Sequence, residues 1–355
     1  MRETAGKTRD SNMELLRIVS MLMVLGVHID GASLNLPQLH GNWFLATSRD
    51  VWQLFVEALC IIGVNCFTLI SGYFGIRLRL KSMGVYLFQC IFYAVGIYSV
   101  FCLLTPGTFS WEEWGESWLV LTHTDLWYVP AYFCLMLLAP FINAGFSAMK
   151  RTASLWITVG FMIYNVWAGW WWEGKFNPSG YTVIQLVMMY MIGRCVAAYT
   201  DIFAKLSRKG LIIGSLATFL LMSFLTGWYA GWNPAKAYAY NCPMVIISSV
   251  AFLLLFSTLR FRSRAVNYIA KSAFAVYLLH KAPLIWVRYM KPTVLNLWHF
   301  THSLLVFTLL CLLLMAVIYL LAMLTDAVRR FLSGLLLKIP GKFKSVLTKR
   351  VGSLN

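Results

Sequence analysis

Residues 14–30, ELLRIVSMLMVLGVHID, have the composition of a helix that crosses a membrane, yet they include the ionisable residues Glu14, Arg17 and His28. A transmembrane helix needs about 20 mostly apolar residues. Ionisable side chains inside such a helix are costly and usually mark a functional site. The stretch therefore indicates a membrane protein and supplies its first candidate site.

The rest of the chain repeats this apolar pattern. Of the 355 residues, 60% are hydrophobic and only 12% are charged, less charge than a soluble domain carries. We predict an all-α, polytopic bundle of about ten transmembrane helices. The predicted spans are residues 13–30, 52–75, 83–105, 126–145, 153–171, 181–199, 210–231, 242–259, 271–289 and 301–325.

The excess of positive charge, +17 at neutral pH, follows the membrane topology. If the N-terminus is cytosolic, most Lys and Arg residues fall in the cytosolic tails and loops. Such a bias is typical of the inner side of a membrane. We therefore predict that both termini are cytosolic, and the charge requires no nucleic-acid partner.

Two units are expected along the chain: a transmembrane domain, residues 1–325, and a basic tail, residues 326–355. The tail mixes Leu and Phe with Lys and Arg, which favours an amphipathic helix bound to anionic membrane lipids. The eight cysteines show no C-x-x-C spacing. We therefore predict neither a metal site nor a disulfide framework.

Arg17 and His28 lie 11 residues apart, which is about 20° past three helical turns and about 16 Å along the axis. They thus share one helix face, with Arg17 near the cytosolic side and His28 in the outer half. Glu14 precedes Arg17 by three residues and can pair with it. Two structural alternatives stay open: Arg17 can extend to the headgroups, and His28 can bond to a neighbouring helix.

Other polar and aromatic residues in or beside the predicted spans extend the candidate site. They are Glu57, Asn65, Asp125, Trp127, Tyr128 and His280. Glu57 falls at a depth similar to that of His28 and is a candidate partner for its ring. Trp127 and Tyr128 also suit an interfacial aromatic belt. Lys281 and Arg288, seven residues apart, would share a face of the ninth span.

Four stretches together resemble the acyltransferase 3 family of bacterial integral membrane proteins. They are the R-x10-H spacing of Arg17 and His28, GVNCFTLISGYF (63–74), DLWYVPAYFCLMLLAPFI (125–142) and SAFAVYLLH (272–280). They follow one another in the order typical of the family. Asp125 stands where the family usually has a histidine before Leu-Trp.

The resemblance implies transfer of an acyl group from cytosolic acyl-CoA, with acetyl-CoA expected, to a hydroxyl of a cell-surface or lipid-linked glycan. It also implies a bacterial plasma membrane location and no permanently bound cofactor. Arg17 would contact the donor, whose phosphates Arg77, Arg79 and Lys81 would attract, although positive-inside charge also explains these three.

His28 would act as general base or carry the acyl group itself. Glu14, Glu57, Asn65, Asp125, Trp127, Tyr128 and His280 would bind or orient the substrates. A transporter or flippase of a lipid-linked sugar is the alternative, because it too would keep buried charges. No internal repeat supports it.

Overall fold

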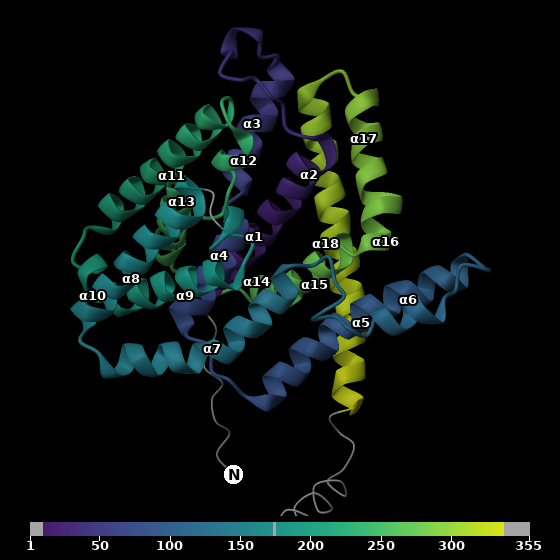
Figure 1. Cartoon of the computed structure of the whole chain (residues 1–355), viewed down its shortest axis with the longest axis horizontal. Helices are drawn as coiled ribbons and strands as arrows, with labels where there is room; N and C mark the ends of the chain where they lie inside the picture. The colour runs from purple at the N-terminus through teal and green to yellow at the C-terminus, as the bar shows by residue number, and fades with distance from the viewer. Residues whose placement is uncertain (1–9, 173–174, 337–355) are drawn as a thin grey trace, which may run out of the picture.

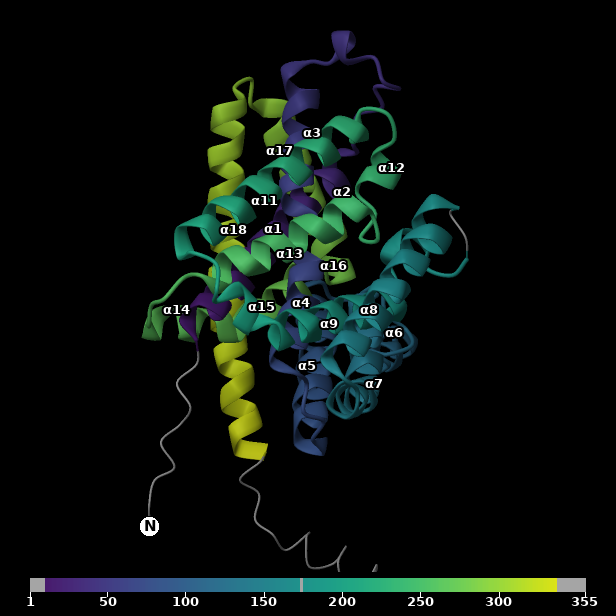
Figure 2. The same cartoon turned by 90° about the vertical axis from the view of Figure 1, so that its left-hand side faces the viewer.

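The computed structural model describes residues 10–172 and 175–336, and every regular element within them is helical. Figures 1 and 2 show α18 (Leu304–Leu336) running almost the full length of the molecule. The loop between α2 (Gly31–Leu34) and α3 (Ser48–Cys60) lies at the end opposite the last turns of α18. The predicted all-α fold class is confirmed for the described residues.

The helices that build the bundle are α1 (Ser11–Ile29), α3, α4 (Gly63–Phe74), α5 (Leu80–Leu104), α7 (Tyr128–Ala148), α8 (Arg151–Asn165), α9 (Val183–Ala198), α11 (Arg208–Ala230), α13 (Pro243–Ser257), α15 (Ala273–His280), α17 (Lys291–Phe300) and α18. Short helices connect them: α2, α6 (Trp111–Glu116), α10 (Thr200–Phe203), α12 (Pro234–Ala237), α14 (Arg264–Ile269) and α16 (Pro283–Ile285). Three short 3₁₀ helices are η1 (Trp43–Leu45), η3 (Pro178–Gly180) and η4 (Ala270–Ser272), and two short π-helices are η2 (Val166–Trp171) and η5 (Trp286–Met290).

Six segments of the described chain are long and apolar enough to cross a membrane, so the protein is a multi-pass membrane protein. They are Ser11–Leu34, Ser48–Phe74, Leu80–Leu104, Tyr128–Ala148, Arg208–Ala230 and Leu304–Leu335. Two shorter apolar helices, α9 and α13, match the predicted spans at 181–199 and 242–259. The predicted span at 153–171 corresponds to α8 and the π-helical turn η2. The count of ten and the cytosolic termini stay predictions.

The predicted span at 271–289 is not one continuous helix. α15 ends at His280, Ala282 is extended, and α16 starts at Pro283. Proline disfavours the helical conformation in the residue before it, which explains the break. Lys281 and Arg288 therefore do not share a helix face: their cations lie over the rings of Trp286 and Phe101.

Helix α1 lies in the interior of the bundle, where it contacts α3, α4, α13, α14, α15 and α18. None of its residues from 11 to 29 is exposed, so α1 has little surface left for lipid. Its polar side chains are therefore placed among protein groups.

The final helix extends past the predicted end of the last span at residue 325. Its 33 residues would measure about 50 Å, against about 30 Å for a bilayer core. The extension carries Asp326, which is fully buried. Residues 337–355, most of the predicted amphipathic tail, lie outside the described residues.

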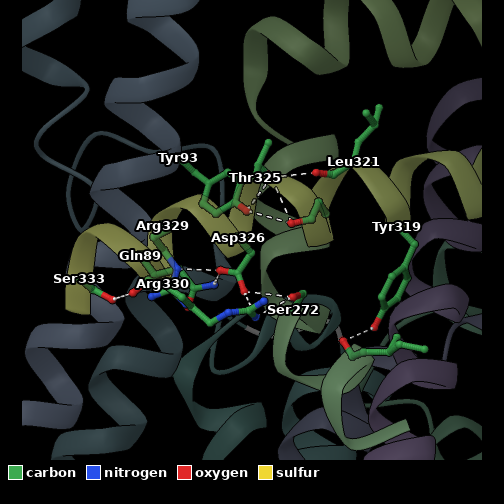
Figure 3. A network of polar contacts seen from close by, with 12 residues as sticks. Gln89, Tyr93, Ser272, Tyr319, Leu321, Thr325, Asp326, Arg329, Arg330 and Ser333 are labelled. Carbon is green, nitrogen blue, oxygen red and sulfur yellow. Dashed lines mark hydrogen bonds and ion pairs between the residues drawn. The ribbon is translucent and has the colours of Figure 1, made fainter. Parts of the chain in front are cut away.

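Figure 3 shows the polar cluster around Asp326. Its carboxylate forms an ion pair of 2.6 Å with each of Arg329 and Arg330. Ser272, at the start of α15, donates to the same carboxylate at 3.0 Å. Gln89 of α5 adds a weaker bond at 3.4 Å. The cluster ties α5, α15 and α18 together through one carboxylate.

Close contact between α4 and α9 depends on two glycines. A Cβ on Gly72 would lie 2.2 Å from the carbonyl oxygen of Tyr190, and one on Gly193 would lie 2.4 Å from that of Leu69. Small residues let membrane helices approach closely where no hydrophobic effect drives their association. The two helix backbones can approach this closely because the residue at each point of contact is a glycine, which has no side chain.

The Gly72→Ala variant is expected to be less stable by about 1–3 kcal/mol, the usual cost of overpacking. The added methyl group meets a backbone carbonyl, which cannot rotate away. Thermal unfolding of the detergent-purified protein measures the loss as a lower midpoint. Gly96→Ala on α5 is the matched control, since a Cβ there meets nothing within 4 Å. Equal midpoints for the two variants would contradict the close packing.

Candidate active site

Two histidines from distant parts of the chain meet in the interior of the bundle. Nδ1 of His28, in the last turn of α1, lies 2.8 Å from Nε2 of His280, the last residue of α15. His280 is 1% exposed, and its Nδ1 lies 2.6 Å from the carbonyl oxygen of Val276. The partner of the His28 ring is thus His280.

These contacts assign the proton positions on both rings. A carbonyl oxygen only accepts, so Nδ1 of His280 donates to Val276 and Nε2 of a neutral His280 is an acceptor. Nδ1 of His28 must then be the donor of the 2.8 Å bond. Nε2 of His28 is left with its lone pair free, which is the form that a general base or a nucleophile needs.

His28 lines a cavity of about 420 Å³. The candidate residues Glu57, Asp125 and Trp127 line it too, whereas Asn65, Tyr128 and His280 do not. Its further polar or aromatic walls come from Ser179, Tyr181, Tyr238, Tyr240, Tyr277 and Lys281. The cavity therefore joins three of the predicted site residues to the imidazole.

Aromatic rings form one wall of this cavity. Trp127, before α7, has its ring centroid 5.0 Å from that of Tyr181 and 5.8 Å from that of Tyr240. Tyr181 and Tyr240 are 4.9 Å apart. Tyr128 lies behind the site instead, with its ring 6.1 Å from that of Tyr277. Aromatic side chains are rigid and have one apolar and one polar part, so they suit a ligand of mixed polarity.

Asn65 stabilises this aromatic wall through a hydrogen bond to the backbone of Tyr240. Its side-chain amide donates to the carbonyl oxygen of Tyr240 at 2.9 Å, and Gln185 donates to the same carbonyl at 2.7 Å. Gln185 also donates to Asn65 Oδ1 at 3.2 Å, and both residues are fully buried. Asn65 thus positions Tyr240 and does not touch the cavity itself.

Glu57 does not bond to the imidazole, contrary to the sequence-based hypothesis: among the described residues its hydrogen-bond donor is the amide of Gly31, at 3.3 Å. A Cβ on Gly31 would lie 2.8 Å from Oε1 of Glu57, so the glycine makes room for the carboxylate. Asp30 lies next to it in the chain, fully buried, with Oδ1 accepting from Gln53 at 3.1 Å. Glu57 thus lines the cavity without a hydrogen bond to either imidazole, and Asp30 is buried beside Gly31 in the chain.

Arg17 and Glu14 form the ion pair that their spacing predicts, at 2.6 Å. Because α1 is unbroken from Ser11 to Ile29, the helical spacing between Arg17 and His28 is also as predicted. The cavity at His28 does not include Arg17, whose side chain is 29% exposed. Arg17 thus lies apart from the imidazole, toward the start of α1.

The basic residues Arg77, Arg79 and Lys81 are exposed on the connection between α4 and α5 and on the first turn of α5. The cavity at His28 contains none of them. Their predicted contact with the donor's phosphates would occur on the surface.

Sequence reasoning missed Lys281, Tyr181 and Tyr240 as cavity residues. Lys281 had a visible signal, since it follows His280 directly and precedes Ala-Pro, a break in a predicted span. The two tyrosines had none, because only the tertiary fold brings residues 127, 181 and 240 together.

His280→Ala is expected to lower the rate of the reaction that uses the His28 imidazole as base or nucleophile by about 10²-fold. The reason is that His28 then loses the acceptor that fixes its tautomer. His280→Gln is the control, since its amide oxygen can accept from Nδ1 of His28, and it should recover part of the loss. Turnover by the purified variants measures both effects. Full activity of His280→Ala would contradict the assigned tautomer.

One family model matches most of the chain. The family model described as "Acyltransferase domain" (acyltransferase 3) matches residues 10–323, which include His28, His280 and the cavity. No match to the chain was found among curated proteins or among solved structures. Since the match covers most of the sequence, the protein belongs to the acyltransferase 3 family.

Proposed function

We propose that the protein transfers an acyl group, with acetyl expected, from acyl-CoA to a hydroxyl of a cell-surface or lipid-linked glycan at the bacterial plasma membrane. The observation that carries the proposal is the chain from His28 through His280 to the Val276 carbonyl. It leaves one unprotonated imidazole nitrogen on a residue that lines the cavity. Family membership supports acyl transfer as the reaction class.

The walls of the cavity suit a sugar as acceptor. The rings of Trp127, Tyr181 and Tyr240 offer apolar faces to the ring of a saccharide, and carboxylates accept hydrogen bonds from its hydroxyls. Glu57 and Asp125 supply these carboxylates in the same cavity.

In the proposed reaction, Nε2 of His28 removes the proton of the acceptor hydroxyl while its oxygen attacks the thioester carbonyl carbon. The tetrahedral intermediate then collapses, the C–S bond breaks and the CoA thiolate leaves. The imidazolium returns its proton to the thiolate. His280 accepts the hydrogen bond from Nδ1 of His28 throughout, as a base-orienting residue does in hydrolytic triads.

Arg17 would bind the donor on the cytosolic side, with Glu14 as its partner when no donor is present. The surface residues Arg77, Arg79 and Lys81 would attract the phosphates of CoA. An acyl-imidazole on Nε2 of His28 is the second route to the same product. The two routes are distinguished by incubating the protein with acetyl-CoA and no glycoside, quenching the reaction and measuring the mass of the protein. Only the second route leaves an acetyl group on His28.

The test uses protein purified in lipid nanodiscs, acetyl-CoA, and a panel of methyl glycosides of hexoses, N-acetylhexosamines and 6-deoxyhexoses. We expect release of the CoA thiol that depends on a glycoside, together with an O-acetylated glycoside in the product mixture. A flippase would move its cargo and leave acetyl-CoA intact. Absence of thiol release with every glycoside would overturn the proposal.

A further inference from the structure

Lys281 is held at the wall of the same cavity by the break between α15 and α16. It is the residue after His280, and it caps α15 with its amide bonded to the Tyr277 carbonyl. A cation is favourable at the C-terminal end of a helix, where carbonyl groups concentrate negative charge. Lipid would penalise an ammonium group in a continuous span, whereas here the residue that carries it lines a cavity inside the bundle.

The ammonium and the imidazole lie beside one indole ring. Nζ of Lys281 is 3.8 Å from the centroid of Trp286, and the ring of His28 meets that of Trp286 edge-on at 5.7 Å between centroids. A cation–π contact of this kind holds a cation without neutralising its charge. Trp286 thus keeps the positive group next to the proposed base.

No carboxylate among the described residues forms an ion pair with Lys281. Asp125 lines the cavity with it, and its carboxylate acts on the ammonium at longer range without forming an ion pair. A half-buried cation that no ion pair holds can stabilise an anion that develops in the cavity. Acyl transfer forms such an anion on the carbonyl oxygen of the thioester.

We propose that Lys281 is a catalytic residue that stabilises the oxyanion of the acyl-transfer intermediate, an inference that rests on the proposed function. As the acceptor oxygen bonds to the carbonyl carbon, the π electrons of the C=O bond move to its oxygen, which pairs with the ammonium. The acceptor's proton goes to Nε2 of His28. When the C–S bond breaks, the electrons return to the carbonyl, and Lys281 keeps its protons throughout.

The experiment compares Lys281→Met with wild type in the thiol-release assay, with acetyl-CoA and the best methyl glycoside of the panel. Removing one donor to an oxyanion lowers kcat about 10²–10³-fold in enzymes studied this way. We expect that loss in kcat, with the KM of either substrate changed by less than about threefold. Lys205→Met, at an exposed residue that does not line the cavity, is the matched control and should keep wild-type kcat.

Lys281→Arg keeps a cation and should retain at least about a tenth of wild-type kcat, which also decides the question if the methionine variant does not fold. Wild-type kcat in folded Lys281→Met, or a loss confined to the KM of the glycoside, would overturn the assignment. So would a folded arginine variant without activity. If wild type itself releases no thiol, the proposed function fails first, and the two failures are thereby separate.

Discussion

His28→Ala is expected to lower acyl transfer by at least about 10³-fold while the protein still inserts and folds. The imidazole is the group that accepts the hydroxyl proton, and general-base catalysis together with its positioning accounts for losses of this size. Thiol release from acetyl-CoA in the presence of a glycoside measures the change. Insertion and folding are checked by membrane fractionation and by size-exclusion chromatography of the detergent-purified variant.

The control for this variant removes a histidine that has no place in the cavity. His299→Ala, in the exposed last turn of α17, should leave transfer unchanged. Imidazole added to His28→Ala should restore part of the activity, because the truncated side chain leaves space for it. Wild-type turnover in His28→Ala would remove the imidazole from the mechanism and leave the cavity without its base.

Asp326→Ala is expected to destabilise the protein by about 3–5 kcal/mol, the cost of breaking a buried ion pair by removing one partner. The carboxylate is fully buried and holds the guanidinium groups of Arg329 and Arg330 at 2.6 Å each. Without it, Arg329 is left 5% exposed with no opposite charge. A lower thermal midpoint and a lower yield of folded protein measure the effect.

Two further variants test whether charge causes this loss. Ser272→Ala removes only one hydroxyl from the cluster and should cost about 1 kcal/mol. A triple replacement, Asp326→Leu with Arg329→Met and Arg330→Met, removes all three charges and should recover most of the stability. If the triple variant is as unstable as Asp326→Ala, loss of packing explains the effect better than unpaired charge.

The helical class and the α1 pattern could be predicted because both depend on residues close in sequence. Apolar runs of sufficient length specify membrane helices, and a separation of three residues brings Glu14 next to Arg17. The break at Pro283 was also visible in the sequence. It was missed because the apolar run continues through it, and hydropathy does not register the backbone effect of proline.

The internal order of the site could not be predicted, since it depends on contacts between distant helices. His28 and His280 are 252 residues apart in sequence. Glu57 has a suitable depth for the imidazole, but depth does not define the direction in which a side chain points. In the structure its carboxylate lies at the amide of Gly31. Asn65 and Tyr128 likewise lie behind the cavity wall.

Helix α15 carries a fixed point at each of its ends. Just before its start, Ser272 is hydrogen-bonded to the buried Asp326, and at its end His280 accepts a hydrogen bond from Nδ1 of His28. Its eight residues form a helix about 12 Å long, which is too short to bend appreciably. The ionic cluster at Asp326 and the proposed base at His28 are therefore joined through one short helix, so the position of α18 helps to fix the position of His280.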